Sequence, residues 1–135
     1  MGAACAAVEA HVRCWNGLER SGWLSLFSVD VTFDDPVGVP TKQGRAAAES
    51  SWDRSHRPGR TWMLHAERIV ESTDGLECAV IMTNHGVVDG VPAIVNGIEI
   101  WRVNRDGRVV AVRAYFEQPT AVELDPYFRA DPPRL

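Results

Sequence analysis

Two adjacent aspartates, Asp34 and Asp35, end a β-prone run in the stretch VTFDDPVGVP, which covers residues 31–40. Successive residues of a strand point to opposite faces, so one carboxyl would face the interior and the other would face solvent. A carboxylate among apolar residues is poorly solvated, which makes the inward aspartate a candidate general base. The alternative is that both acids only stabilise the turn that begins at Pro36.

A third carboxyl, Glu99, lies in the otherwise apolar run AIVNGIEIWRV. In an extended strand it shares a face with Gly97 and Trp101, whereas Ile98 and Ile100 share the opposite face. If the face of Glu99 is buried, desolvation raises its pKa and keeps it protonated, so that it can donate a hydrogen bond. The alternative is a glutamate at the rim of a sheet, facing water.

His11 lies on the apolar stripe of a helical pattern, together with Val8, Val12 and Trp15. A single histidine in this position is either a core residue or a buried hydrogen-bonding group. The chain also has five tryptophans, which suit an ordinary core or a pocket for a flat hydrophobic ligand. The aromatic residues open to both interpretations are Trp15, Trp23, Trp52, Trp62, Trp101 and Phe116.

The elements that position these residues follow from hydrophobic periodicity. The pattern predicts helices over residues 3–16, 21–27 and 44–55, and strands over residues 31–34, 62–70, 76–84, 91–103 and 108–117. Helices followed by consecutive strands predict an α+β fold, with three N-terminal helices packed on a strongly curved antiparallel sheet. Such a sheet, closed by helices, encloses an apolar interior that suits a small molecule.

Composition and charge exclude several functions. A chain of 135 residues predicts one domain over residues 1–135, with an irregular, proline-rich tail from about residue 118. A net charge of −4 with scattered arginines argues against nucleic-acid binding, and no apolar run reaches the roughly 18 residues of a membrane span. Three cysteines without metal-ligand spacing, and a poor signal peptide, predict a cytoplasmic protein with free thiols and no metal site.

Two segments resemble a known family. HVRCWNGLERSGWLSLFSVDVTFDDPVGVPTKQGRAAAESSW and GIEIWRVNRDGRVVAVRAYF resemble the ketosteroid isomerases. These belong to a wider group that shares the nuclear transport factor 2 (NTF2) cone fold and includes polyketide cyclases of the SnoaL type. The resemblance covers roughly residues 8–116, and DDPVG after a strand is its most specific part. It implies an NTF2-like cone and a homodimer that pairs through the outer face of the sheet.

The resemblance also implies roles for individual residues. The aspartate immediately before Pro-Val-Gly, Asp35 in this chain, takes the position of the catalytic base. Glu99 takes the position of the protonated acid in the oxyanion hole, a feature for which ketosteroid isomerase is the established example. The family's tyrosine on the first helix falls on His11, and a second, supporting tyrosine falls on Trp52, so the usual phenol network is absent.

These roles predict an enzyme similar to steroid Δ-isomerases, which moves a proton next to a carbonyl of a steroid-like substrate without a cofactor. Asp35 is the predicted base, and Glu99 and His11 are the predicted donors to the oxyanion. The predicted substrate contacts are Trp15, Val37, Trp52, Trp101 and Phe116. The alternatives are a non-catalytic binding protein for a hydrophobic small molecule, or a polyketide cyclase or epoxide hydrolase on the same fold.

Overall fold

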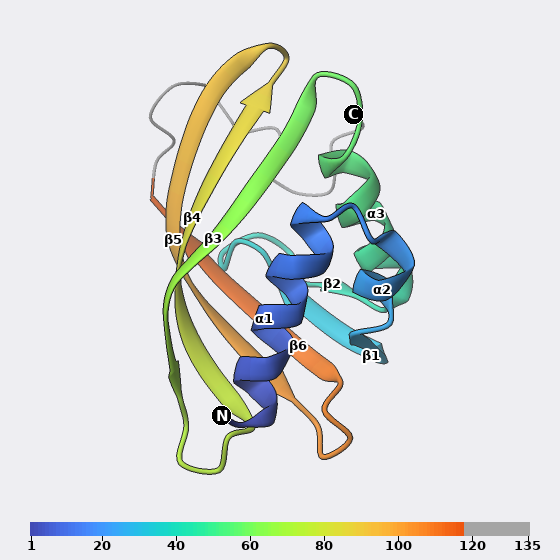
Figure 1. The fold of residues 1–135 in the computed structure, drawn as a ribbon. Helices are drawn as coiled ribbons and strands as arrows, with labels where there is room; N and C mark the ends of the chain where they lie inside the picture. The colour runs from blue at the N-terminus through green and yellow to red at the C-terminus, as the bar shows by residue number, and fades with distance from the viewer. Residues whose placement is uncertain (118–135) are drawn as a thin grey trace.

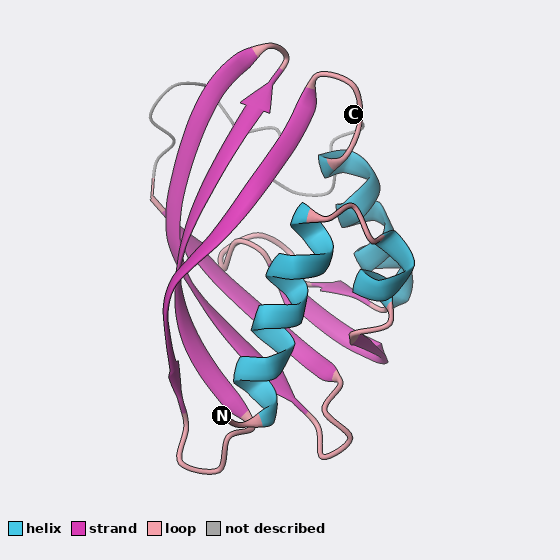
Figure 2. Cartoon of the chain, viewed as in Figure 1, coloured by secondary structure: helices cyan, strands magenta, loops and turns pink. Residues whose placement is uncertain are grey.

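The computed structural model describes residues 1–117, so the predicted tail from about residue 118 lies outside the described residues. Three helices pack against one face of a six-stranded sheet (Figures 1 and 2), which confirms the predicted α+β class. The elements in chain order are α1 (Ala3–Asn16), α2 (Arg20–Leu24), β1 (Phe27–Asp34), β2 (Lys42–Gln43), α3 (Arg45–Ser55), β3 (Arg60–Glu71), β4 (Glu77–Val88), β5 (Val91–Val103) and β6 (Val109–Phe116).

The strands are ordered β2-β1-β6-β5-β4-β3 in the sheet. Only the β1–β6 pair among them is parallel, so the sheet is mixed. Two irregularities in the register, between Ala66 and Arg68 of β3 and between Arg102 and Val103 of β5, bend the long strands. The result is the strongly curved sheet in Figure 1, whose concave face is covered by the helices.

Several element boundaries differ from the sequence-based predictions. The second helix ends at Leu24, and Phe27, predicted to end that helix, instead begins β1. Phe27 is fully buried and pairs with Val109 of β6, so tertiary pairing overrides the local helical pattern. The two-residue strand β2 was not predicted, because a segment of two residues carries no periodicity.

The core lies between the helices and the concave face of the sheet. Its fully buried side chains come from both layers, namely Val8, Phe27, Val31, Val80, Met82 and Val109. The predicted apolar stripe of α1 is confirmed for Val8, His11 and Trp15, all of which are buried. The longest described helix, α1, has 14 residues, and none of the described helices could span a bilayer.

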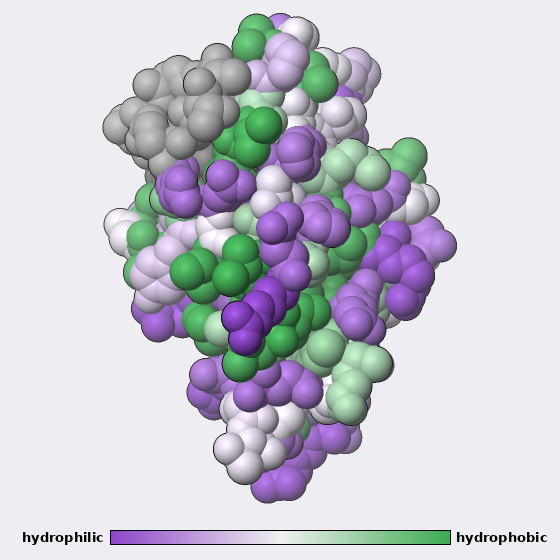
Figure 3. Space-filling view, turned by 60° about the vertical axis from the view of Figure 1, so that its left-hand side comes forward, coloured by the Kyte–Doolittle hydropathy of each residue, from purple (hydrophilic) through white to green (hydrophobic). Residues whose placement is uncertain are grey.

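The outer face of the sheet carries exposed apolar side chains. Ile81 of β4 lies opposite Ile98 of β5, and Ile98 lies opposite Tyr115 of β6, so these three residues form a continuous row across three strands. All three are about half exposed. Hydrophobic side chains gather in the middle of the face turned toward the viewer in Figure 3. We call Ile81, Ile98 and Tyr115 the outer apolar row.

Glu71, at the end of β3, holds the start of α1. The helix has no side-chain cap of its own, and the carboxylate of Glu71 accepts hydrogen bonds from the backbone N–H groups of Gly2, at 3.0 Å, and Cys5, at 3.1 Å. These two bonds lower the pKa of Glu71. The ionised carboxylate therefore fastens the helix that carries His11 to the edge of the sheet.

We predict that Glu71→Gln lowers the melting temperature at neutral pH, whereas Glu77→Gln, at an exposed position in β4, changes it little. Because folding lowers the pKa of Glu71, its contribution is fully present above the pKa of the unfolded chain. That contribution is lost as the pH falls through the folded value. The difference between wild type and Glu71→Gln in thermal melts should therefore shrink in acid. Equal melting temperatures of the two variants at neutral pH would contradict this assignment.

Candidate functional site

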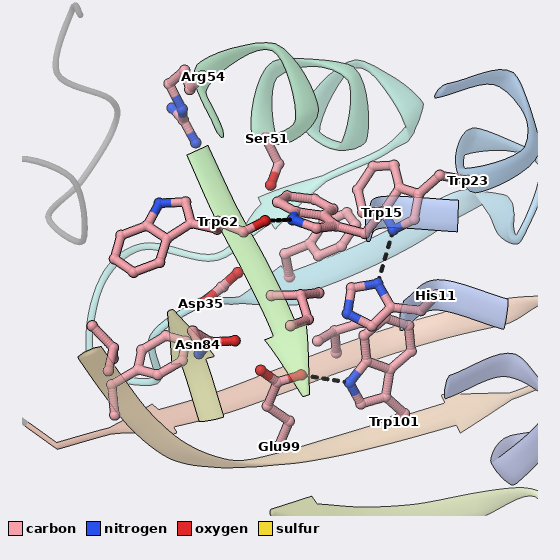
Figure 4. A pocket seen from close by; sticks show the side chains of 15 residues that line it. His11, Trp15, Trp23, Asp35, Ser51, Arg54, Trp62, Asn84, Glu99 and Trp101 are labelled. Carbon is pink, nitrogen blue, oxygen red and sulfur yellow. Dashed lines mark hydrogen bonds between the residues drawn. The ribbon is translucent and has the colours of Figure 1, made fainter. Parts of the chain in front are cut away.

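A pocket lies between the helices and the concave face of the sheet (Figure 4). The empty space that it outlines is about 800 Å³, a volume that includes the part open to solvent. Four tryptophans contribute to its walls: Trp15, Trp23, Trp62 and Trp101. The remaining lining residues are His11, Phe33, Asp35, Ser51, Arg54, Leu64, Asn84, Val95, Glu99, Val112 and Phe116.

Glu99 lies on the inward face of β5, as strand alternation predicts. Its side chain is only 7% exposed, and its Oε1 accepts a hydrogen bond of 2.8 Å from the indole Nε1 of Trp101. Burial raises the pKa of Glu99 from 4.5 to about 7, helped by the negative charge of Asp35 and opposed by the Trp101 bond. The prediction of a buried Glu99 with a raised pKa is confirmed. Its other oxygen faces the pocket (Figure 4).

The two adjacent aspartates face opposite sides, as predicted. Asp35 lines the pocket, where burial raises its pKa and the positive charges of Lys42 and Arg54 oppose the rise. Asp34 instead forms an ion pair of 3.4 Å with Arg113 and accepts a hydrogen bond from Thr41. The alternative reading, that the acids stabilise the loop, therefore applies to Asp34, whereas Asp35 faces the pocket.

His11 is buried and electrically neutral. Its Nδ1 accepts a hydrogen bond of 2.8 Å from the indole Nε1 of Trp23, and burial lowers its pKa to about 3. Because Nδ1 accepts, the proton of the neutral ring is assigned to Nε2, which becomes the single donor of the imidazole. The ring lies 4.4 Å from the indole of Trp101, measured between ring centroids. His11, Trp101 and Glu99 thus adjoin one another along one wall (Figure 4).

The predicted substrate contacts divide into two groups. Trp15, Trp101 and Phe116 line the pocket, whereas Val37 and Trp52 are absent from the described lining residues. Trp52 is buried behind the pocket wall, with its ring centroid 5.3 Å from that of Trp15. It lies there because α3 directs it toward the other helices, so it supports the wall from behind. The backbone N–H of Val37 donates to the β6 carbonyl of Ala114, which fixes the loop that follows Asp35.

Sequence reasoning missed three polar residues of the pocket. Ser51 and Arg54 are three positions apart on α3, a spacing that places both on one face of a helix. Asn84 lies on the inward face of β4, which continues to Val88 rather than ending at residue 84 as predicted. Asn84 was predicted to end this strand, and the alternation of the strand was a usable signal for its inward face.

The chemistry that this site supports is proton transfer. Asp35 and Glu99 are two carboxyls in one pocket, and such a pair can supply a base and an acid when their surroundings differ. Neutral His11 adds a second donor next to Glu99. Within residues 1–117, no three His, Cys, Asp or Glu side chains are grouped in a way that would hold a metal ion.

Several solved structures are similar to this chain. A computationally designed 17-OHP binder is 26% identical, with a TM-score of 0.81 over 90% of this chain and 98% of its own. RV0760c from Mycobacterium tuberculosis, in complex with estradiol-17beta-hemisuccinate, is 26% identical, with a TM-score of 0.79 over 87% of this chain and 95% of its own. The Delta 5-3-ketosteroid isomerase from Mycobacterium sp. is 23% identical and shares the fold, with a TM-score of 0.80 over 90% of this chain and all of its own (100%).

These neighbours confirm the predicted cone architecture, which the curvature of the sheet and the position of the three helices already indicate. The family model of the SnoaL-like domain matches residues 8–123. The match takes in residues 8–16 of the first helix, the loop after Asp35 and the strand of Glu99. Since this family model matches most of the sequence, the chain belongs to the SnoaL-like domain family, and it has the NTF2-like fold.

Proposed function

We propose that this protein is an enzyme similar to ketosteroid isomerases, which moves a proton next to a carbonyl of a flat, hydrophobic, steroid-like substrate. One observation carries the proposal: Asp35 and Glu99 share a tryptophan-lined pocket in which burial raises the pKa of both. The designed 17-OHP binder and the estradiol complex support a steroid-like ligand, because both cones are 26% identical to this one.

The reaction begins with Asp35, whose carboxylate removes a proton from the carbon between a ketone and a β,γ double bond. The electrons of the broken C–H bond move into a dienolate, and negative charge develops on the ketone oxygen. Glu99, through its pocket-facing oxygen, and His11, through Nε2–H, donate hydrogen bonds to that oxygen. Asp35 then returns the proton to the far carbon of the diene, which leaves a conjugated enone and the original carboxylate.

The protonation states of Asp35 and Glu99 set the pH range in which the proposed enzyme is active. Asp35 must be ionised to act as the base, so activity rises as the pH passes its raised pKa. Glu99 must be protonated to donate, and its pKa of about 7 means that this donor is lost as the pH rises above neutrality. His11, with a pKa of about 3, stays neutral throughout this range. Activity is therefore greatest where Asp35 is ionised and Glu99 is still protonated, and it declines as the pH rises above about 7.

A non-catalytic binding protein is the second candidate, and one observation favours it. No tyrosine is found among the described residues that line the pocket, so His11 replaces a phenol as the second donor. An assay for conjugated enone by ultraviolet absorbance separates the two candidates, because a binder holds the ketone without forming enone. Product mass separates an isomerase from an epoxide hydrolase, because hydrolysis adds a water.

We also propose that the protein is a homodimer that pairs through the outer face of the sheet. The outer apolar row of Ile81, Ile98 and Tyr115 supports this, because a contiguous exposed apolar surface favours association. A second copy offers the same row, which suits a two-fold symmetric contact.

We predict that Asp35→Asn lowers kcat for a β,γ-unsaturated steroid ketone by about 10²- to 10⁴-fold, because the amide cannot accept the proton. Asp34→Asn, the matched control, should retain nearly full activity and lose less than about 1 kcal/mol of stability with its partly exposed ion pair to Arg113. Circular dichroism checks that both variants fold. Equal losses of activity would show that Asp35 is not the base.

A second prediction concerns the alkaline side of the pH profile. In wild type, kcat/KM should fall above a pH of about 7 as Glu99 ionises. Glu99→Gln cannot ionise and keeps an N–H donor, so it should be active but lack this decline. Glu99→Leu has no donor and should lose roughly 10²- to 10³-fold in kcat. A decline that persists in Glu99→Gln would assign it to another group.

The dimer gives a third prediction. Ile98→Asp, which places a charge in the outer apolar row, should convert a dimer to a monomer in light scattering at micromolar concentration. Val29→Asp is the matched control, because Val29 is an exposed apolar residue of β1 outside the row. A monomeric wild type, or an Ile98→Asp variant that remains dimeric, would contradict the interface.

A further inference from the structure

Asn84 is a buried polar residue with no role in the reaction proposed above. The inward positions of β4 before it hold apolar side chains, Val80 and Met82. Its register neighbours are Leu64 of β3 and Val95 of β5, which also line the pocket. Asn84 is 8% exposed, and its Oδ1 has no hydrogen-bond partner among residues 1–117. Figure 4 shows its carboxamide directed into the pocket.

A second asparagine, Asn16, has a structural role, and both ends of its side-chain amide are hydrogen-bonded. The side chain of Asn16 donates to the backbone carbonyl of Leu64 at 2.8 Å and accepts from the N–H of the same residue at 2.9 Å. It thereby joins α1 to β3 with both ends of the amide paired. Asn84 lies beside the same Leu64 in the sheet but leaves Oδ1 unpaired, and an unpaired buried polar atom destabilises the empty protein. A ligand atom in the pocket that donates a hydrogen bond to Oδ1 would remove this destabilisation.

The position of Asn84 fixes which part of a ligand it reaches. Its register partner Val95 is four residues from Glu99 along β5, a span of about 13 Å in an extended strand that the curvature of the sheet shortens. The β4–β5 wall of the pocket therefore carries polar side chains at two points along its length, Glu99 at one and Asn84 at the other. A ligand whose reacting carbonyl lies at Glu99 brings its opposite end toward Asn84.

We propose that Asn84 is a specificity residue that hydrogen-bonds a neutral oxygen substituent, a ketone or a hydroxyl, at the end of the ligand remote from the reacting carbonyl. A carboxamide both donates and accepts, so it can pair with either group. The proposal rests on the proposed function for the orientation of the ligand. It narrows the substrate class to elongated, flat molecules with an oxygen at each end, and it disfavours analogues that lack the remote oxygen.

Binding of a matched pair of steroids by isothermal titration calorimetry tests this assignment without turnover. The pair is androstenedione, with a ketone at each end of its ring system, and the analogue in which a methylene replaces the ketone of the five-membered ring. Wild type should bind the diketone about tenfold more tightly, because the analogue leaves Asn84 unpaired. In Asn84→Leu and Asn84→Val the ratio should fall to about one. Met82→Leu, on the same strand face, should keep the wild-type ratio.

The outcomes separate this proposal from the proposed function. The expected binding ratios, together with no formation of conjugated enone from a β,γ-unsaturated steroid ketone in the ultraviolet assay, would support the role of Asn84 and contradict the enzyme. Isomerisation by wild type, with the preference for the diketone retained in both folded Asn84 variants, would overturn the role of Asn84 alone. A wild type with no preference between the two steroids would overturn it as well. Two variants of different shape guard against a packing defect, and thermal melts show that each is folded.

Discussion

The desolvation of Glu99 is the interaction on which the rest of the site depends. A glutamate in water ionises with a pKa near 4.5, but the apolar and aromatic surroundings of Glu99 raise that value to about 7. Asp35 shares the pocket, yet the charges of Lys42 and Arg54 work against the same rise there. Different charges thus act on the two carboxyls, and the proposed reaction uses Asp35 as the base and Glu99 as the donor.

Two indole N–H groups orient the proposed donors, Glu99 and His11. Trp101 holds one oxygen of Glu99, and Trp23 holds Nδ1 of His11, so each of these side chains has one polar atom fixed and another turned to the pocket. An indole supplies a single donor on a large apolar body, so it orients a polar group without adding further polar surface. Preorganised donors of this kind need little rearrangement as charge develops on a bound oxygen.

The fold supplies the geometry through strand alternation and curvature. Alternation places Glu99 and Trp101 on one face of β5, and it separates Asp35 from Asp34 at the end of β1. The bends in β3 and β5 curve the sheet around the helices, which brings α1 and its His11 over the same face. The pocket is thus built from residues far apart in sequence.

Local sequence patterns are enough to predict which face of the sheet Glu99 and the two aspartates occupy, because side chains along a strand alternate with a period of two residues. The periodicity of α1 likewise predicts that His11 is buried. The Trp23–His11 bond depends on how α2 packs on α1, which no local pattern records. Asn84 lies in the strand predicted over residues 76–84, but its place in the pocket depends on its neighbours in β3 and β5, Leu64 and Val95, which no local pattern records.

The burial of Glu99 is tested most directly by a carbon-13 NMR titration of the glutamate side-chain carboxyls, with Glu99→Gln used to assign the resonance of Glu99. The account predicts a midpoint at a pH of about 7 for Glu99. It also predicts that the midpoint in Asp35→Asn is lower than this but still well above 4.5, because desolvation is the larger cause and the charge of Asp35 the smaller. A midpoint near 4.5 in the wild-type protein would mean that Glu99 is an ordinary solvated carboxylate, and would contradict the account.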